Sequence, residues 1–369
     1  MDNRKYVITA GHVCLDIHVK GNVPGPGQLE VIGPAGFSTG GAVANTGIAC
    51  AKFGLPTMLM GLIGQDYFGD ILQSVLSQSL PENGMLQMAV SPEATTSFSM
   101  VLNRPAEDRA FEHHPGANDR FGANDILYEA VDQARIFHFG YPPLMRLMYA
   151  DNGIALASIF KEVRRRGALT SLDLVKVNPE SEAARADWSL ILQRVLPSVS
   201  LFAPSIGEVL DLVPEFRGLE ENNPCYWARI ASTFIEWGAG AVLLKLGAMG
   251  LYLRTATTFL GLSGDDTWSD REIIGLPFQE NVFAGTTGAG DSAIAGFLAA
   301  MYYNVDPLFC VRFANAAGSC CIEAADATSG LQSWDQINSR IEAGWANLEP
   351  RADLSEWAQI KSGLYVPAP

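Results

Sequence analysis

The feature that most constrains this chain is a long stretch in which strand-like and helix-like segments take turns. Apolar runs of strand length end at polar or glycine residues, and segments with helical periodicity separate them. The alternation predicts an α/β fold with a mostly parallel sheet covered by helices on both faces. The expected segments, in chain order, are a strand at 135–139, a helix at 150–166, a strand at 168–174, a helix at 188–196, a strand at 199–203, a helix at 224–237 and a strand at 241–246.

Two stretches of the chain depart from this pattern. They lie at about 13–39 and about 95–113 and alternate like exposed sheet, and the second has a polar hairpin turn at 103–108. We interpret residues 1–369 as a single domain in which these two stretches form a small β-sheet lid. The remaining expected elements are strands at 6–11 and 57–63 and helices at 41–53, 70–79, 291–303 and 307–323.

Composition excludes several classes of partner. The formal net charge is −15, from 25 basic and 40 acidic residues, whereas nucleic acids and anionic membranes are bound by clustered Lys and Arg. No apolar run approaches the length of a membrane span, and the N-terminus lacks the apolar core of a secretion signal. The six cysteines show no CxxC or Cys/His ligand spacing. We therefore expect a cytoplasmic protein with buried thiols and no membrane or nucleic-acid partner.

A glycine-rich turn precedes the apolar helix expected at 291–303. The turn reads Thr-Thr-Gly-Ala-Gly-Asp over 286–291 and ends at Asp291. Glycines before a helix let the backbone approach a ligand, and the first-turn N–H groups then face it with the positive end of the helix dipole. This arrangement is typical of an anion hole for a transferring phosphoryl group. Asp291 is the candidate base, although an Asp at this place also serves as a plain helix cap.

A second polar motif opens the helix expected at 41–53. Gly40 and Gly41 allow close contact between backbone N–H groups and a polyol, and Asn45 offers both a donor and an acceptor. Asp16, just after the first strand, can accept hydrogen bonds from hydroxyl groups. Each of these residues also has a structural interpretation, as a turn, a cap or a loop carboxylate. The segment 61–69 has the composition of a strand-end turn into a helix, and we interpret it as structural.

Taken together, these segments resemble the PfkB (ribokinase-like) family of carbohydrate and nucleoside kinases over nearly the whole chain. Residues 40–69 resemble its N-terminal signature, and 286–296 resemble its more specific C-terminal one. Residues 116–118 and 245–250 resemble the turn after the lid and the strand and turn beside the nucleotide. The resemblance implies a ribokinase-like three-layer sandwich with a small β-sheet lid. It also implies an ATP-dependent carbohydrate kinase that uses Mg²⁺.

Residue roles follow from the resemblance by matching position. Asp291 is the implied catalytic base, and Glu208 the residue that organises Mg²⁺ through water. The implied substrate-binding residues are Asp16, Gly40, Gly41 and Asn45. The implied ATP-binding residues are Lys245, Leu246, Gly247, Ala248, Met249, Gly250, Gly288, Ala289, Gly290 and Asn315.

Four places depart from the family pattern. Ser205 replaces an Asn near the phosphates, and Gly285 replaces an Asp that often binds a monovalent cation, so potassium activation is in doubt. The segment around Asp173 only loosely resembles its fructokinase counterpart. Tyr141 lies about where ribokinases place an acidic residue.

These departures leave the substrate and part of the function open. The leading hypothesis is a kinase of a small sugar, and the alternatives are a nucleoside kinase or a sugar-binding protein that has lost phosphotransfer. Phe98, Phe111 and Tyr141 would supply aromatic walls for a nucleobase. His113 and His114 lie next to each other, so we expect them on opposite faces of a strand, one packed and one exposed. Strand edges in the lid would allow a homodimer.

Overall fold

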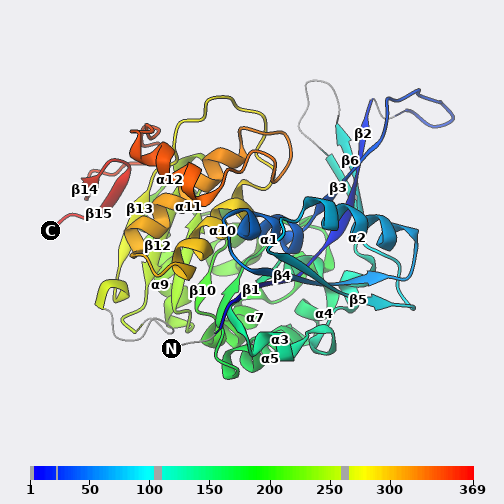
Figure 1. Cartoon of the computed structure of the whole chain (residues 1–369). Coiled ribbons are helices and arrows are strands. Elements are labelled where there is room, and N and C mark those ends of the chain that lie inside the picture. Colours follow the sequence, from blue (N-terminus) through cyan, green and yellow to red (C-terminus); the bar gives the residue numbers. More distant parts are fainter. Residues whose placement is uncertain (1–3, 22–23, 104–109, 259–265) are drawn as a thin grey trace.

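An eleven-stranded sheet forms the centre of the molecule (Figure 1). The computed structural model describes residues 4–21, 24–103, 110–258 and 266–369. The strand order is β14-β15-β13-β12-β11-β10-β9-β8-β1-β4-β5. The strands are β1 (Tyr6–Gly11), β4 (Thr57–Gly64), β5 (Gly84–Ser91), β8 (Ala134–Gly140), β9 (Leu169–Leu172), β10 (Leu201–Phe202), β11 (Ala241–Lys245), β12 (Leu251–Thr255), β13 (Glu272–Gly275), β14 (Trp357–Lys361) and β15 (Leu364–Pro367).

The strands from β5 to β11 in this order are all parallel, and those from β12 to β14 are antiparallel to their neighbours. The parallel strands β1, β4 and β11 are buried along most of their length, as their apolar composition predicts for a sheet covered on both faces. The expected α/β fold with a mostly parallel sheet is therefore confirmed. In such a sheet the carboxyl ends of the strands meet at one edge, where ligands bind.

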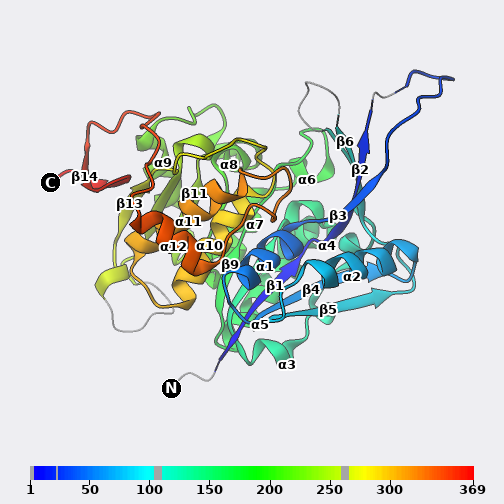
Figure 2. The ribbon, with the colours of Figure 1, turned by 45° about the horizontal axis from the view of Figure 1, so that its top comes forward.

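Helices cover both faces of this sheet (Figures 1 and 2). One apolar core lies between the sheet and α5, α7 and α9, and a second between the sheet and α1, α10, α11 and α12. The helices are α1 (Ala42–Lys52), α2 (Tyr67–Ser79), α3 (Tyr128–Val131), α4 (Arg146–Tyr149), α5 (Ile154–Arg165), α6 (Glu182–Arg185), α7 (Trp188–Val195), α8 (Ile206–Leu212), α9 (Pro224–Glu236), α10 (Ala289–Tyr302), α11 (Pro307–Cys321) and α12 (Trp334–Glu342). In the described part of the chain, no helix has the length and apolarity to cross a bilayer.

A separate four-stranded sheet projects from the α/β body (Figure 1). Its order is β3-β2-β6-β7, with β2 (Cys14–Lys20), β3 (Gly36–Gly40), β6 (Phe98–Asn103) and β7 (Ala110–His114). The two stretches expected to form exposed sheet supply all four strands, and β6 and β7 pair antiparallel as a hairpin should. The predicted turn falls partly at 104–109, outside the described residues. We call β2, β3, β6 and β7 the small sheet.

Several elements differ from the prediction for local reasons. The helix expected from residue 150 begins at Ile154, because Asp151 and Asn152 have left-handed backbones, with φ of 50° and 52°. Strands β12 to β15, the helix α12 and the parallel edge strand β5 were not predicted. β5 is only half-buried, and β14 is exposed along part of its length, so neither has the continuous apolar run of a central strand.

Candidate active site

Asp291 lies in the first turn of α10, directly after the glycine turn. Gly288 caps the helix with a left-handed φ of 79°, and a Cβ there would lie 2.4 Å from the Cβ of Ala327. Backbone conformation and close packing therefore both require glycine. α10 has 14 residues, so a full helix dipole stands behind its N-terminal N–H groups. The turn presents backbone donors and one carboxylate to the same space.

The carboxylate of Asp291 is buried and receives hydrogen bonds from two other parts of the chain. Asn45 Nδ2 of α1 donates to Oδ2 over 3.0 Å, although the two residues are 246 positions apart. Thr46 Oγ1 lies 3.4 Å from Oδ1. The hydroxyl of Tyr141, at the end of β8, donates to the same carboxylate at 2.8 and 2.9 Å. Residues of α1 and the residue after β8 thus hold the predicted base in place.

The surroundings of Asp291 tune its basicity. Burial raises the pKa of Asp291 above its usual range, and Lys245 and the hydrogen bonds from Asn45, Tyr141 and Thr46 oppose that rise. A raised pKa makes the carboxylate a better proton acceptor than an exposed one. Burial and the neighbouring Asp291 also raise the pKa of Tyr141, so the phenol stays protonated as a donor.

The paired glycines lie where side chains would collide with polar groups of the site. A Cβ on Gly40 would lie 2.5 Å from Oδ2 of Asp16, which shows how closely this carboxylate approaches the backbone. A Cβ on Gly41, whose φ is 89°, would lie 2.6 Å from Nδ1 of His12. The Oδ1 atom of Asn45 is buried with no hydrogen-bond partner among the described residues. It is an acceptor that a ligand hydroxyl can satisfy.

A cavity of about 320 Å³ connects the sugar-side residues with the glycine turn. Its walls come from β2 and β3 of the small sheet, from α1 and from residues 326–329. The lining includes Asp16, Ser38, Asn45, Thr287 and Thr328. Of the predicted site residues, Asp16 and Asn45 line this cavity, and the glycine turn contributes Thr287, whereas Asp291 is reached through its hydrogen bond with Asn45.

A cluster of carboxylates surrounds one lysine beside the glycine turn. Lys245 Nζ donates to Oδ1 of Asp173 over 2.6 Å, and both side chains are buried. Burial alone would lower the pKa of Lys245, but the neighbouring carboxylates, Asp173 first among them, raise it. Burial raises the pKa of Asp173, and Lys245 opposes this. The charges of Glu208 and Asp291 also raise the pKa of both Asp173 and Lys245. The three carboxylates of Asp173, Glu208 and Asp291 therefore share one ammonium.

This acidic cluster has the donor set that Mg²⁺ prefers. Oδ2 of Asp173 is buried without a hydrogen-bond partner in the described part of the chain, and Glu208 lies in the same cluster. The departure at Ser205 has a local consequence. Ser205 and Glu208 form a capping box at the start of α8, in which Oε2 of Glu208 accepts from the Ser205 N–H at 2.7 Å. One oxygen of Glu208 is thus engaged, and the carboxylate has a fixed orientation.

The residues expected to contact ATP fall into two groups. Gly247 and Ala248 form an exposed turn after β11, and Gly250 closes it with a φ of 95°, where a Cβ would lie 2.0 Å from the Gly275 oxygen. Leu246 is buried and Met249 partly buried. Asn315 is buried on α11, and its Nδ2 donates to the Val311 carbonyl of the same helix. Its amide nitrogen therefore already has an intrahelical partner.

Tyr141 and Thr46 are contacts of the base that motif reasoning did not identify. Thr46 directly follows Asn45, and Tyr141 follows β8, which lies beside β1 in the sheet. Tyr141 also has a φ of 65°, a value unusual for a large side chain. Position at the carboxyl end of a central strand was the signal available for it.

Of the three candidate aromatic walls, Phe98 lies elsewhere. Its ring packs against Phe68 and His114, so it belongs to a small apolar cluster rather than to the cavity. Phe111 lines the cavity and is 54% exposed. His114 is exposed and His113 half-buried, as expected for neighbours on one strand.

Comparison with known proteins agrees with this geometry. The profile of the pfkB family carbohydrate kinase matches residues 4–334. An uncharacterized sugar kinase of Archaeoglobus fulgidus is 26% identical over 281 residues, which cover 76% of this chain and 97% of that protein. Arabidopsis thaliana ribokinase complexed with ribose and ATP has the same fold, with a TM-score of 0.69 at 21% identity over 91% of this chain and 98% of that one. Xylella fastidiosa fructokinase with bound ATP gives a TM-score of 0.69 at 20% identity, covering 92% and 99%. The chain belongs to the pfkB family of carbohydrate kinases.

Proposed function

We propose that this protein is an ATP-dependent kinase that transfers a phosphoryl group to a hydroxyl of a small sugar, with Asp291 as the proton acceptor. One observation carries the proposal. Asp291 stands at the N-terminus of α10 beside the glycine turn, and Asn45 of α1 binds the same carboxylate from the cavity side. A carboxylate between an anion hole and a polyol-sized cavity is the arrangement that phosphoryl transfer to an alcohol requires.

The chain's own groups have distinct tasks in this reaction. Asp291 orients the attacking hydroxyl and takes its proton as the new oxygen–phosphorus bond forms and the bond to the leaving ADP oxygen breaks. The transfer of the proton is late, because a carboxylate cannot ionise an unactivated alcohol in advance. The N–H groups of Gly288, Ala289 and Gly290 stabilise charge on the phosphoryl oxygens. The hydroxyl groups of Tyr141 and of the substrate both donate hydrogen bonds to Asp291, and the Tyr141 bond holds the carboxylate in position.

ATP and Mg²⁺ are the expected cofactors. ATP supplies the phosphoryl group, and Mg²⁺ neutralises charge on its phosphates. Glu208, acting through water, and Asp173 are the carboxylates placed to hold the metal. Lys245 lies beside the glycine turn, since a Cβ on Gly290 would be 3.6 Å from its Nζ. Residues 246–250 and Asn315 are proposed to contact the nucleotide.

On the acceptor side we assign Asp16, Gly40, Gly41 and Asn45 to the sugar. A nucleoside kinase is the second candidate, because Phe111 offers aromatic surface in the cavity and Tyr141 lies against Asp291. A panel of sugars and nucleosides, assayed for ADP formation with Mg²⁺-ATP, tests the proposal. We expect turnover with at least one sugar and none with nucleosides. Turnover only with nucleosides would select the second candidate, and binding without turnover would indicate a sugar-binding protein.

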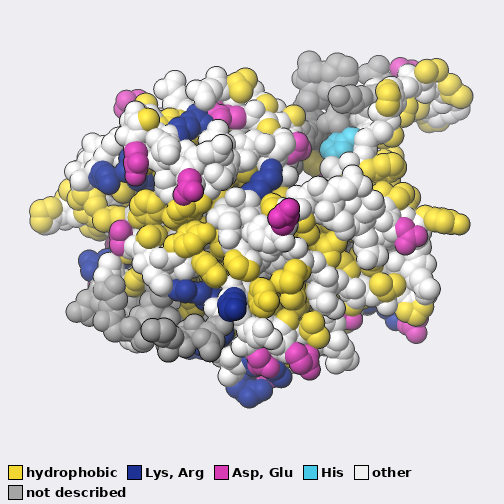
Figure 3. Space-filling model, in the orientation of Figure 1, with side chains coloured by type: hydrophobic (Ala, Val, Ile, Leu, Met, Phe, Trp, Pro, Cys, Tyr) yellow, Lys and Arg dark blue, Asp and Glu magenta, His cyan; other side chains and the backbone are white. Residues whose placement is uncertain are grey.

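The arrangement of the whole protein is also a proposal. We expect a single domain whose small sheet acts as a lid over the cavity and pairs with a second copy in a homodimer. Hydrophobic side chains are exposed on the projecting part of the molecule (Figure 3) and support an interface there, among them Leu29, Val31, Phe37 and Phe111. Light scattering gives the mass that tests the dimer. Six cysteines without a disulfide support a reducing, cytoplasmic location, which cell fractionation tests.

A further inference from the structure

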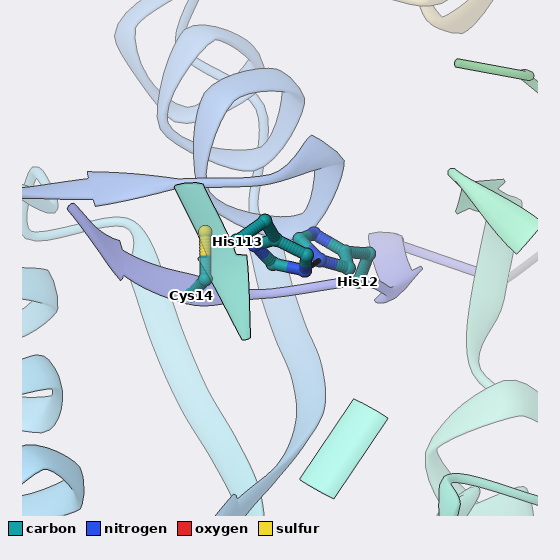
Figure 4. A group of neighbouring side chains, drawn as sticks. All are labelled: His12, Cys14 and His113. Carbon is teal, nitrogen blue, oxygen red and sulfur yellow. Dashed lines mark hydrogen bonds between the residues drawn. The ribbon is translucent and has the colours of Figure 1, made fainter. Parts of the chain in front are cut away.

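Three side chains with metal-ligating atoms converge beside the sugar-side glycines. His12 follows β1, Cys14 begins β2 and His113 lies on β7 of the small sheet. Figure 4 shows the two imidazole rings side by side with Cys14 next to His113. One ligand atom from each residue lies within 4.8 Å of the others, and the two Nε2 atoms are 3.2 Å apart. Neither the catalytic chemistry nor the assigned sugar contacts uses this cluster.

The fold, rather than local sequence, creates this convergence. Asp16 on β2 pairs with Ser99 on β6, and Ser99 pairs with His113 on β7, so the three form a row across the small sheet. Cys14 lies two residues before Asp16 and therefore points to the same face. His12 reaches the row from the main sheet, so the cluster joins the small sheet to the α/β body.

Most polar atoms of the cluster have protein partners: the Cys14 thiol contacts Asp16 and Ser99, and the ring nitrogens of His113 contact Ser99 and His12. Two neutral rings that face each other through Nε2 share at most one hydrogen bond. Nδ1 of His12 is buried with no hydrogen-bond partner among the described residues.

The distances fit a tetrahedral cation of the zinc class. Bonds of about 2.0 Å to nitrogen and 2.3 Å to sulfur place two tetrahedral nitrogens about 3.3 Å apart and a nitrogen and a sulfur about 3.5 Å apart. The two Nε2 atoms already stand at 3.2 Å. The three ligand atoms lie within 4.8 Å of one another, and the thiol, which contacts Asp16 and Ser99, has to move toward the rings to complete the site. Neutral imidazole with thiolate is a ligand set for Zn²⁺, whereas Mg²⁺ requires oxygen ligands.

Two neighbours complete the environment of such a site. Ser99 Oγ lies 3.1 Å from Nδ1 of His113, which fixes the ring and leaves its Nε2 directed at His12. Asp16 Oδ1 lies 3.3 Å from Cys14 Sγ, within the spacing of two ligands on one metal. Asp16 is also a proposed sugar contact, so a metal drawing on this carboxylate competes with the substrate.

We propose that His12, Cys14 and His113 bind Zn²⁺ or a similar borderline divalent cation, and that the bound ion ties the small sheet to the α/β body and blocks sugar binding. Binding releases one proton, from the Cys14 thiol to solvent, and the imidazoles bind as neutral ligands without any redox change. The inhibitory consequence rests on the proposed sugar-kinase function. The binding itself does not.

The direct test is titration of the chelator-treated full-length protein with Co²⁺, a spectroscopic substitute for Zn²⁺. We expect a thiolate-to-cobalt charge-transfer band and tetrahedral d–d bands that saturate at about one equivalent. Cys14→Ser should abolish the charge-transfer band, and His113→Ala should lose the tetrahedral bands. The matched controls are Cys225→Ser, which removes an exposed thiol, and His114→Ala, which removes the adjacent exposed ring. Both should bind Co²⁺ like the wild type.

Three results would overturn the site: no charge-transfer band in the wild type, an equal loss in Cys225→Ser, or an unchanged spectrum in Cys14→Ser. An absent band in the wild type overturns the site even if a variant fails to fold, because the band requires a thiolate ligand. In the kinetic arm, saturating Zn²⁺ with Mg²⁺-ATP in excess should raise the apparent KM for the sugar about tenfold and leave kcat unchanged. Equal inhibition of His113→Ala and His114→Ala would refute the blocking role. Cobalt binding without turnover on any sugar would uphold the site and count against the proposed function.

Discussion

The phosphate end and the sugar end of the cavity are built in different ways. At the phosphate end, one short segment supplies a glycine turn, a helix N-terminus and Asp291 together. At the sugar end, single side chains arrive from several elements, Asp16 from β2, Asn45 from α1 and Tyr141 from the end of β8. In the proposed function, the first end binds through backbone N–H groups, and the second through side chains held in place by the fold.

This difference has a physical origin. Every ATP molecule presents the same phosphates, so backbone N–H groups at a helix N-terminus suffice to bind them. Those groups require a particular local conformation, which restricts the sequence of the turn. Sugars differ in the arrangement of their hydroxyls, and side chains from separate strands can be exchanged without disturbing the turn. Substitutions at the two ends should therefore affect different measurable quantities.

The largest effect is expected where the two ends meet, at Asp291. Asp291→Asn keeps the shape and removes the proton acceptor, so kcat should fall about 10²–10⁴-fold while ATP affinity stays close to that of the wild type. The control is Asp70→Asn, an exposed first-turn Asp of α2, which should leave kcat unchanged. Rapid-quench or coupled ADP assays measure this. An Asp291→Asn enzyme within threefold of the wild type would refute the role of the base.

The next largest effect should come from the buried ammonium at the phosphate end. Lys245→Met leaves Asp173, Glu208 and Asp291 without their shared cation, and removing one partner of a buried pair costs about 3–5 kcal/mol of unfolding free energy. Denaturant unfolding measures this loss. Lys176→Met, which breaks the exposed pair with Asp211 at 3.2 Å, should cost about 0–1 kcal/mol. Similar losses in the two variants would show that the Lys245 pair contributes no more than a surface pair.

Smaller effects are expected at the sugar end, where Asn45→Ala also removes a hydrogen bond to Asp291. Asn45→Ala and Asp16→Ala should each lower kcat/KM for the sugar about 5- to 150-fold, a loss of roughly 1–3 kcal/mol, because a hydroxyl of the substrate loses its partner. ATP KM and Tm should barely change. Asn118→Ala is the contrasting variant. The Asn118 side chain hydrogen-bonds to the backbone N–H and carbonyl of Val13, so its removal should lower Tm instead. A drop in Tm with unchanged kinetics for Asn45→Ala would make Asn45 a structural residue as well.

The same contrast explains how far sequence reasoning reached. The turn at 286–291 and the Gly40-Gly41 pair each consist of neighbouring residues, so the sequence alone indicates their chemistry. The structure then brings side-chain atoms of Asp291, at the end of the turn, and of Asn45, after the glycine pair, to 3.0 Å. The contacts of Tyr141 and His12 depend on β8 lying beside β1, a long-range pairing that no local pattern records. Likewise, the sequence identified Asp173 only as part of a departure from the family pattern. Its contact with Lys245 depends on the sheet, because Asp173 follows β9 and Lys245 ends β11.

Tyr141 offers a finer test, through the pH dependence of the reaction. Its hydrogen bonds lower the pKa of Asp291, against the rise caused by burial. The base acts deprotonated, so kcat/KM falls as pH drops through this pKa. Tyr141→Phe removes the donor and should move the acidic limb to higher pH by about one unit, the equivalent of one hydrogen bond to a charged group.

The matched control for Tyr141→Phe is Tyr252→Phe. Tyr252 donates to Glu272 at 2.7 Å in another tyrosine–carboxylate pair, so it tests loss of such a pair away from the cavity. Its pH profile should match that of the wild type. An acidic limb that stays in place in Tyr141→Phe, or moves to lower pH, would show that the phenol does not control the base.

The smallest effect is expected for potassium, at the phosphate end. The family pattern that the sequence resembles implies a carboxylate where this chain has Gly285, and carbonyl oxygens alone hold a hard cation weakly. Turnover should therefore hardly change between KCl and choline chloride at constant ionic strength. Gly285→Asp sharpens the test, because it should create a potassium response that the wild type lacks. A tenfold, potassium-specific rise in the wild type would mean that backbone carbonyls suffice, so that this end of the cavity relies on its backbone for cations as well as for phosphate.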